Sequence, residues 1–131
     1  MAKRVIQTDA APQAIGPYSQ AVLAGETLYV SGQIPLVPET MELEAGDFAT
    51  SVRRVFRNLQ AVVEAAGGRL DQVVKITVYL TDMGHFPVVN EVLAEFFDEP
   101  YPARAAVGVA ELPKGASVEA DAIVALGPVH A

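Results

Sequence analysis

The sequence predicts an α+β fold in which two helices cover one face of a mixed β-sheet, forming a two-layer sandwich. Two segments carry apolar residues at helical spacing, and six short segments have the composition of strands, in the order β-β-β-α-β-α-β-β. Two helices can cover only one face of such a sheet, so the other face needs cover, and we expect oligomerisation into a closed ring. The 131 residues contain no linker and predict a single domain, 1–131.

The two helices are indicated by their apolar stripes and by the residues at their ends. The first is expected to begin after Asp47, as its N-cap, and to stop at Gly67-Gly68. The second is expected from near Pro87 to Phe97, ahead of two further prolines. Steps of three and four place one stripe on a single face of the first helix: Phe48, Val52, Val55, Leu59, Val62 and Ala66.

The strands are indicated by short apolar runs that turn residues separate. Ala24-Gly25-Glu26 reads as a hairpin connection between the second and third strands. In the fourth, we expect alternation to place Val74, Ile76, Val78 and Leu80 on the covered face and Lys75, Thr77 and Tyr79 on the other. The predicted strands are Arg4–Gln7, Gln20–Leu23, Thr27–Ser31, Val73–Leu80, Ala105–Val109 and Val118–Leu126.

Composition and charge exclude several classes of protein. A formal net charge of −7 and a pI near 4.7 argue against a general affinity for nucleic acid or for anionic membranes. The basic cluster Arg53, Arg54 and Arg57 is interpreted as a solvated helix face. Without cysteine, a signal-peptide pattern or an apolar run of membrane-spanning length, the sequence leads us to expect a cytoplasmic protein.

Few side chains offer catalytic chemistry. His85 and His130 lack partners at metal-ligand spacing, and no phosphate-binding or nucleophile motif is present, so no metal and no cofactor are expected. Arg104 follows Tyr101-Pro102-Ala103 and precedes small apolar residues, where a guanidinium is costly to desolvate without an anion. That anion could be an internal carboxylate (Glu99, Glu111 or Glu119) or the carboxylate of a bound ligand, and residue type leaves both readings open.

Three further segments have both a structural and a functional interpretation. Glu119 alternates with apolar residues in the last strand, either as an outward-facing charge or as a partly buried carboxylate that orients a water. Gly32, in Ser31-Gly32-Gln33, marks either a strand-end bulge or a close backbone approach to a ligand. Tyr18 either packs at the edge of the core or reaches a site.

Taken together, these segments resemble the RidA (YjgF-like) family of reactive enamine/imine deaminases. The resemblance covers nearly the whole chain, in order and at the family's spacing, although each motif alone is weak. The matching pieces are Ile15-Gly16-Pro17-Tyr18-Ser19-Gln20-Ala21, Val30-Ser31-Gly32-Gln33-Ile34-Pro35, Val74-Lys75-Ile76-Thr77-Val78-Tyr79-Leu80, Asn90, Pro102-Ala103-Arg104 and Val118-Glu119. It implies a chorismate-mutase-like fold, a homotrimer and active sites in the clefts between subunits.

The resemblance also implies a role for each residue. Arg104 would bind the substrate carboxylate and Glu119 would hold the hydrolytic water. The cleft would be lined by Tyr18, Ser31, Gly32 and Asn90, with the backbone amide of Ala106 on the ligand. Many relatives carry Cys at Ala106, so thiol reactivity is absent here, and Ala120 replaces a larger aliphatic residue behind Glu119.

The implied reaction is hydrolysis of 2-aminoacrylate or a related 2-imino acid to a 2-keto acid and ammonia. An iminium carbon is already electrophilic, so the protein need only position the acid and a water. The alternative is a non-catalytic module of the same fold that binds 2-keto acids or another protein. The RNA cleavage attributed to some relatives is disfavoured by the net charge of −7 and by the absence of a basic aromatic groove.

Overall fold

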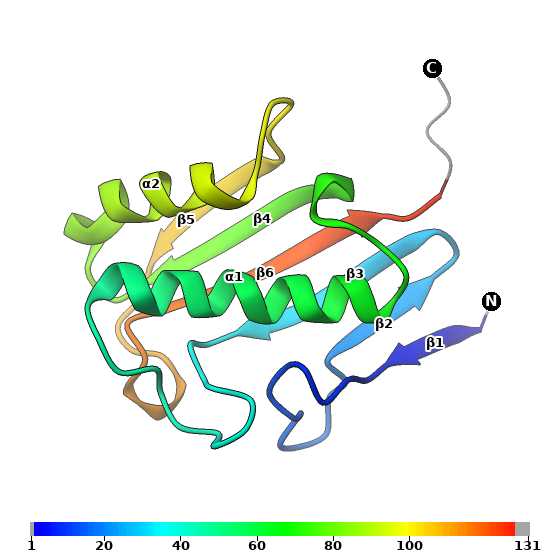
Figure 1. Ribbon diagram of the computed structural model, residues 1–131, viewed down its shortest axis with the longest axis horizontal. Coiled ribbons are helices and arrows are strands. Elements are labelled where there is room, and N and C mark those ends of the chain that lie inside the picture. The colour runs from blue at the N-terminus through cyan, green and yellow to red at the C-terminus, as the bar shows by residue number, and fades with distance from the viewer. Residues whose placement is uncertain (1, 128–131) are drawn as a thin grey trace.

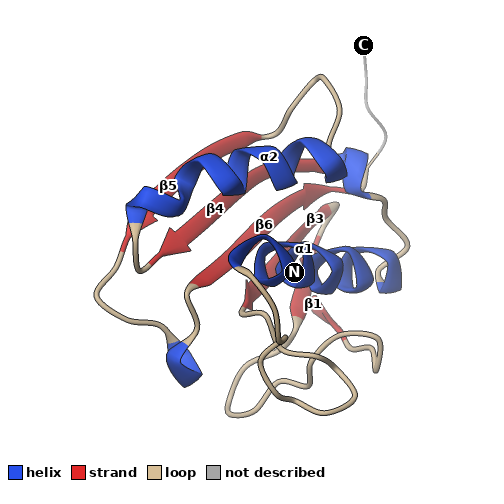
Figure 2. Cartoon of the chain, turned by 60° about the vertical axis from the view of Figure 1, so that its left-hand side comes forward, coloured by secondary structure: helices blue, strands red, loops and turns tan. Residues whose placement is uncertain are grey.

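The computed structural model describes residues 2–127 and confirms the two-layer α+β sandwich. One sheet contains six strands in the order β1-β2-β3-β6-β4-β5. Helices α1 (Phe48–Ala65) and α2 (Phe86–Phe96) lie side by side on one face of it (Figure 1, Figure 2). The strands are β1 (Lys3–Ile6), β2 (Ala21–Ala24), β3 (Thr27–Gln33), β4 (Val73–Leu80), β5 (Ala103–Gly108) and β6 (Val118–Ala125). Within residues 2–127, no helix is both long and apolar enough to cross a membrane.

The sheet is mixed, as predicted. β4 and β5 pair in parallel, and every other neighbouring pair is antiparallel. Helix α2 supplies the crossover that a parallel pair requires. The expected hairpin joins β2 to β3 through Gly25 and Glu26, and Gly25 takes the left-handed φ of 63° that such a tight turn favours.

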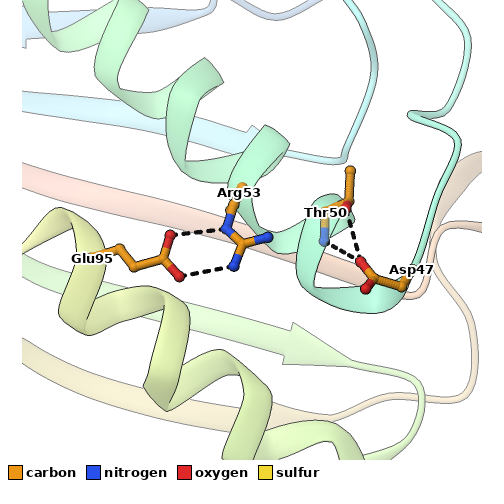
Figure 3. A network of polar contacts seen from close by, with 4 residues as sticks. All are labelled: Asp47, Thr50, Arg53 and Glu95. Atoms are coloured by element: carbon orange, nitrogen blue, oxygen red, sulfur yellow. Dashed lines mark hydrogen bonds and ion pairs between the residues drawn. The ribbon is translucent and has the colours of Figure 1, made fainter.

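Helix α1 holds the core against the sheet. It begins at the predicted N-cap, where Asp47 Oδ1 accepts the backbone N–H of Thr50 at 2.9 Å (Figure 3). Its apolar stripe packs against β3, β6 and α2. Of the predicted stripe, Val52, Val55, Leu59 and Val62 are buried, whereas Phe48 and Ala66 are partly buried. Phe56 and Val63, which the prediction did not include, are buried beside them. The helical period read from the sequence is therefore confirmed.

The basic cluster on α1 is partly engaged with acidic side chains. Arg53 forms a two-bond ion pair with Glu95 of α2, with Nε–Oε1 at 2.8 Å and Nη2–Oε2 at 2.9 Å (Figure 3). Arg54 pairs with Glu44 at 3.4 Å, and Arg57 is exposed. The Arg53–Glu95 pair is exposed to solvent and the Arg54–Glu44 pair partly so, in keeping with a solvated helix face.

Two details of the predicted strands are wrong. Val74 is 47% exposed, whereas Val73 is buried, because the β4–β6 register shifts between Val73 and Lys75. A bulge of this kind places neighbouring residues out of alternation, and the predicted pattern holds from Lys75 onward. β5 also begins two residues earlier than predicted, so Arg104 lies within the strand instead of ahead of it.

The second face of the sheet has no helix on it. The register places Val5, Tyr29 and Val107 on this face, and all three are exposed. Exposed apolar side chains gathered on one sheet face are typical of a contact surface. Cover by further copies of the chain, and the homotrimer in particular, stays a prediction.

Candidate active site

Arg104 is positioned by helix α2. It is the second residue of β5 and pairs in register with the buried Ile76 of β4, so it lies on the helix-covered face. Its guanidinium donates a hydrogen bond to Asn90 Oδ1 and lies 4.7 Å from the centroid of the Phe86 ring. Both partners belong to α2. An amide oxygen and an aromatic face orient the cation without neutralising it.

Arg104 has no anionic partner in the part of the chain that the structure describes. The ion pairs found within residues 2–127 involve other residues, and none joins Arg104 to Glu99, Glu111 or Glu119. The internal salt-bridge alternative is therefore wrong. The guanidinium borders a cavity of about 450 Å³, whose apolar lining includes Leu93. This is the arrangement expected of a receptor for the carboxylate of an organic acid.

Glu119 lies on the opposite face of the sheet. It pairs with Tyr79 of β4, and the β6 residues on either side of it are buried under the helices. Its carboxylate rests directly against Gly32, where the β3–β6 register shifts. A Cβ atom on Gly32 would lie 2.9 Å from Cδ of Glu119, so only glycine leaves room for this carboxylate. Of the two interpretations of Gly32, the structure supports the bulge at the strand end. The approach of the backbone to a ligand stays a prediction.

The surroundings of Glu119 favour its protonated form. Burial raises the pKa of this carboxyl above its ordinary value, and the negative charge of Asp121 raises it further. Asp121 accepts a hydrogen bond from Tyr79 Oη at 3.0 Å. Among residues 2–127, no cation is paired with Glu119. A partly desolvated carboxylate with a raised pKa suits a group that accepts a proton and then returns it.

The cavity beside Glu119 has a volume of about 410 Å³ and is built from loops. Residues 10–20, 34–47 and 109–117 contribute to it, at the end of the sheet where these three loops gather (Figure 1). Tyr18 and Gly32 line this cavity together with Glu119. Tyr18 is exposed, and its hydroxyl oxygen accepts the backbone N–H of Ile15 at 3.3 Å. Ser31, next to Gly32, donates its hydroxyl proton to the Ser19 carbonyl at 2.6 Å.

The predicted site residues thus form two groups within one chain. Arg104 and Asn90 meet on the helix-covered face, and Ala106 lies half-buried on the same edge strand, β5. On the other face and at its loop end, Glu119 meets Gly32, and Tyr18 lines the same cavity. The sheet separates the two groups, so one small ligand cannot contact Arg104 and Glu119 of the same chain.

Three residues at these sites escaped the sequence analysis. Phe86 supports Arg104, and Asp121 acts on Glu119; neither contact has a signature in a single sequence. Gln33 lines the Glu119 cavity and is buried there. Its signal was available, because it directly follows Ser31-Gly32 at the end of a strand.

The histidines form no metal centre where the structure describes them. His85 stacks on Phe48 with ring centroids 4.3 Å apart, and its Nε2 lies 4.0 Å from Asp82 Oδ2. Across residues 2–127, no three His, Asp or Glu side chains gather as metal ligands. His130 lies outside the described residues.

The fold and the two groups define a small α+β domain with an arginine that has no anionic partner among the described residues and, on its other face, a partly buried carboxylate. Comparison with known proteins identifies the family: residues 8–126 match the family model described as Endoribonuclease L-PSP. A protein of Dermatophagoides farinae named 2-iminobutanoate/2-iminopropanoate deaminase is 48% identical, over 95% of this chain and 97% of that one.

Solved structures give the same result. The crystal structure of RidA from an Antarctic Psychrobacter is 55% identical, with a TM-score of 0.90 over 93% of this chain and 98% of that one. E. coli TdcF, solved with bound serine, is 42% identical, with a TM-score of 0.89 over 95% and 99% of the two chains. The protein therefore belongs to the Endoribonuclease L-PSP family, which is the YjgF/RidA family that its sequence resembles.

Proposed function

We propose that this protein is an enamine/imine deaminase that hydrolyses 2-aminoacrylate and related 2-imino acids to 2-keto acids and ammonia. The observation that carries the proposal is the unpaired guanidinium of Arg104, which Asn90 and Phe86 hold at the edge of a cavity. The deaminase name of the Dermatophagoides relative supports the choice of chemistry. A cytoplasmic location belongs to the same proposal.

The reaction requires a carboxylate receptor and a proton acceptor beside the water. Arg104 binds the acid in two hydrogen bonds and fixes C2 of the iminium. The water oxygen bonds to C2 as the C=N π electrons move to nitrogen, and one water proton passes to Glu119. Glu119 returns this proton to the nitrogen, then takes the hydroxyl proton as C=O forms and ammonia leaves. The raised pKa of Glu119 makes both transfers feasible near neutral pH.

We further propose that each site is formed by two copies of the chain in a homotrimer. Arg104, Asn90 and Ala106 would come from one copy. Tyr18, Ser31, Gly32 and Glu119 would come from its neighbour. The proposal is supported by the position of Arg104 and Glu119 on opposite faces of one sheet, and by the uncovered apolar face of that sheet.

The first experiment tests the function. A dehydratase acting on Ser or Thr would generate the enamine, and the wild-type protein should accelerate formation of the 2-keto acid. Losing two charge-assisted hydrogen bonds, each worth about 1.5–3 kcal/mol, should lower the activity of Arg104→Ala by about 10²-fold or more. Arg69→Ala, which removes an exposed arginine paired with Asp71, is the matched control. Inactive wild-type protein would refute the function, and an active, folded Arg104→Ala protein would refute the role of Arg104.

The second experiment tests the shared site. Arg104→Ala and Glu119→Gln subunits, each inactive alone, would be refolded together in equal amounts. If Arg104 and Glu119 come from different copies, about one quarter of the sites receive both intact residues, because each is present with a probability of about one half. Activity should recover to about that fraction of wild type. No recovery from demonstrably mixed oligomers would place the site within one chain.

A binding module without turnover is the second candidate, and the name of the TdcF structure, which includes bound serine, is the observation that favours it. Saturable binding of 2-ketobutyrate without imine hydrolysis would establish this alternative. RNA cleavage, which the family description names, is opposed by the net charge of −7. RNA binding that weakens with salt would reopen it.

A further inference from the structure

The cavity beside Arg104 runs lengthwise between α2 and β5. Its α2 wall includes Asn90, Leu93 and Ala94, which are spaced three and four residues apart and therefore share one side of the helix, and Phe97 follows at the helix end. Leu93 and Ala94 lie about one helical turn, or about 5.4 Å, beyond the Asn90 that holds Arg104. The cavity thus continues along the helix, away from the guanidinium.

The far end of this cavity is bounded by the connection between α2 and β5. Because α2 is the crossover between the parallel strands β4 and β5, it runs antiparallel to β5, and the chain turns back between Phe97 and Tyr101 (Figure 1, Figure 2). Tyr101 and Pro102 of this connection belong to the lining, as does Ile76 of β4. Arg104 therefore lies at one end of the cavity, and the other end is formed by apolar and aromatic side chains.

The lining of this cavity combines a single charge with a mainly apolar surface. Among the described residues that line it, Arg104 is the charged one, and the amide oxygen of Asn90 already accepts from its guanidinium. The carboxylates of the connection, Asp98 and Glu99, do not belong to the lining. Apart from the Tyr101 hydroxyl, the other lining side chains are hydrocarbon. A volume of about 450 Å³ is of the size that holds small organic ligands, so the lining suits a ligand with one carboxylate and an apolar tail.

We infer that this cavity binds the side chain of the substrate and that the preferred 2-imino acids carry an aliphatic side chain longer than a methyl group. With the carboxylate on Arg104, the substituent of C2 extends along Leu93 and Ala94 toward Tyr101, and C2 stays at the mouth of the cavity, open to a second copy of the chain. Each methylene that leaves water for this lining favours binding, whereas a charged side chain finds no partner there. This inference rests on the deaminase function proposed above and names the substrate class of its site.

The first test measures how the wild-type protein ranks a graded series of imines. A D-amino-acid oxidase would generate them from alanine, 2-aminobutyrate and norvaline, and semicarbazide would trap the imine that the protein leaves unhydrolysed. After correction for the trapping rate of each imine, we expect kcat/KM to rise by about 2–4-fold for each added methylene. A flat or falling series in an active protein would overturn the inference while the proposed function stands. Wild-type protein that hydrolyses none of these imines would overturn both.

The second test changes the cavity wall and follows the ratio of kcat/KM for the norvaline imine to that for the alanine imine. Ala94→Leu keeps a strong helix former and adds bulk to the α2 wall, so this ratio should fall by about 4-fold or more. Ala65→Leu is the matched control, the same change at an exposed position at the end of α1, and should keep the wild-type ratio. Tyr101→Ala removes an apolar contact at the far end and should lower the ratio as well; Tyr101 is 59% exposed, so this variant should fold. A wild-type ratio in folded Ala94→Leu, or in Tyr101→Ala should the leucine variant not fold, would overturn the inference.

Discussion

Replacing Gly32 with alanine should disable Glu119 without unfolding the protein. The new Cβ would lie 2.9 Å from Cδ of Glu119 and closer still to Oε2. Carbon atoms in contact lie about 3.5–4.0 Å apart, so the carboxylate must retreat by roughly 0.6–1 Å. It can do so, because it ends a flexible side chain on a face without helices.

The expected magnitudes follow from this displacement. A misplacement of about 1 Å can cost about 10²-fold in rate, equivalent to about 2.7 kcal/mol in the activation barrier. The cost in stability is smaller. Gly32 does not occupy the left-handed region, so alanine should stabilise the fold by about 0.4–1 kcal/mol. An off-rotamer Glu119 should cost about 0.5–1.5 kcal/mol, which offsets that gain.

A double-mutant cycle in the coupled deaminase assay tests whether the effect acts through Glu119. If it does, Gly32→Ala/Glu119→Gln should be no slower than Glu119→Gln alone. Gly84→Ala is the matched control, since its Cβ would lie 3.0 Å from the Asp82 carboxylate, away from either cavity. Activity of Gly32→Ala within about 3-fold of wild type, or losses that simply multiply in the double variant, would refute the reasoning.

Two further predictions concern charge and capping. Glu119 must be ionised to accept a proton, so activity should fall as the pH drops through its raised pKa. Asp121→Asn removes the like charge and should move this limb of the pH–rate profile to lower pH, whereas Asp71→Asn, a change on an exposed side chain, should leave it in place. Asp47→Ala removes the cap on Thr50 and should lower the free energy of unfolding, seen as a lower midpoint in urea titrations, with activity unchanged. Because the hydrogen bond from the Thr50 backbone lowers the pKa of Asp47, this difference should shrink as the pH falls through that pKa; a constant difference would contradict the capping role.

Much of the fold could be predicted because local pattern and tertiary packing agree. Asp47 and Gly67-Gly68 delimit a helix whose apolar period faces the sheet, and Gly25 marks the hairpin turn. Val74 could not be placed, because its exposure follows from a register shift against β6. A bulge depends on how two strands pair, so the alternation of residues within one strand does not predict it.

The sequence could nominate candidate site residues, but it could not predict how these residues are arranged in space. From residue type, Arg104 could form an internal ion pair or bind a ligand. Only the positions of the acidic side chains in the structure exclude the internal ion pair among the described residues. Sequence spacing also could not show that Glu119 rests on Gly32, because the paired strands β3 and β6 are separated by most of the chain.

The separation of Arg104 from Glu119 has a physical advantage for the proposed chemistry. Were the two in contact within one chain, the guanidinium would neutralise the carboxylate and lower its pKa, and Glu119 would be a weak proton acceptor near neutral pH. Keeping them on opposite faces lets burial and Asp121 raise the pKa of Glu119, while Asn90 and Phe86 leave Arg104 available to an acid. A bound substrate would then supply the carboxylate that Arg104 lacks, and association of two copies would place its C2 atom beside Glu119. The sheet that keeps the two charges apart in one chain thus explains why the complete site should require two.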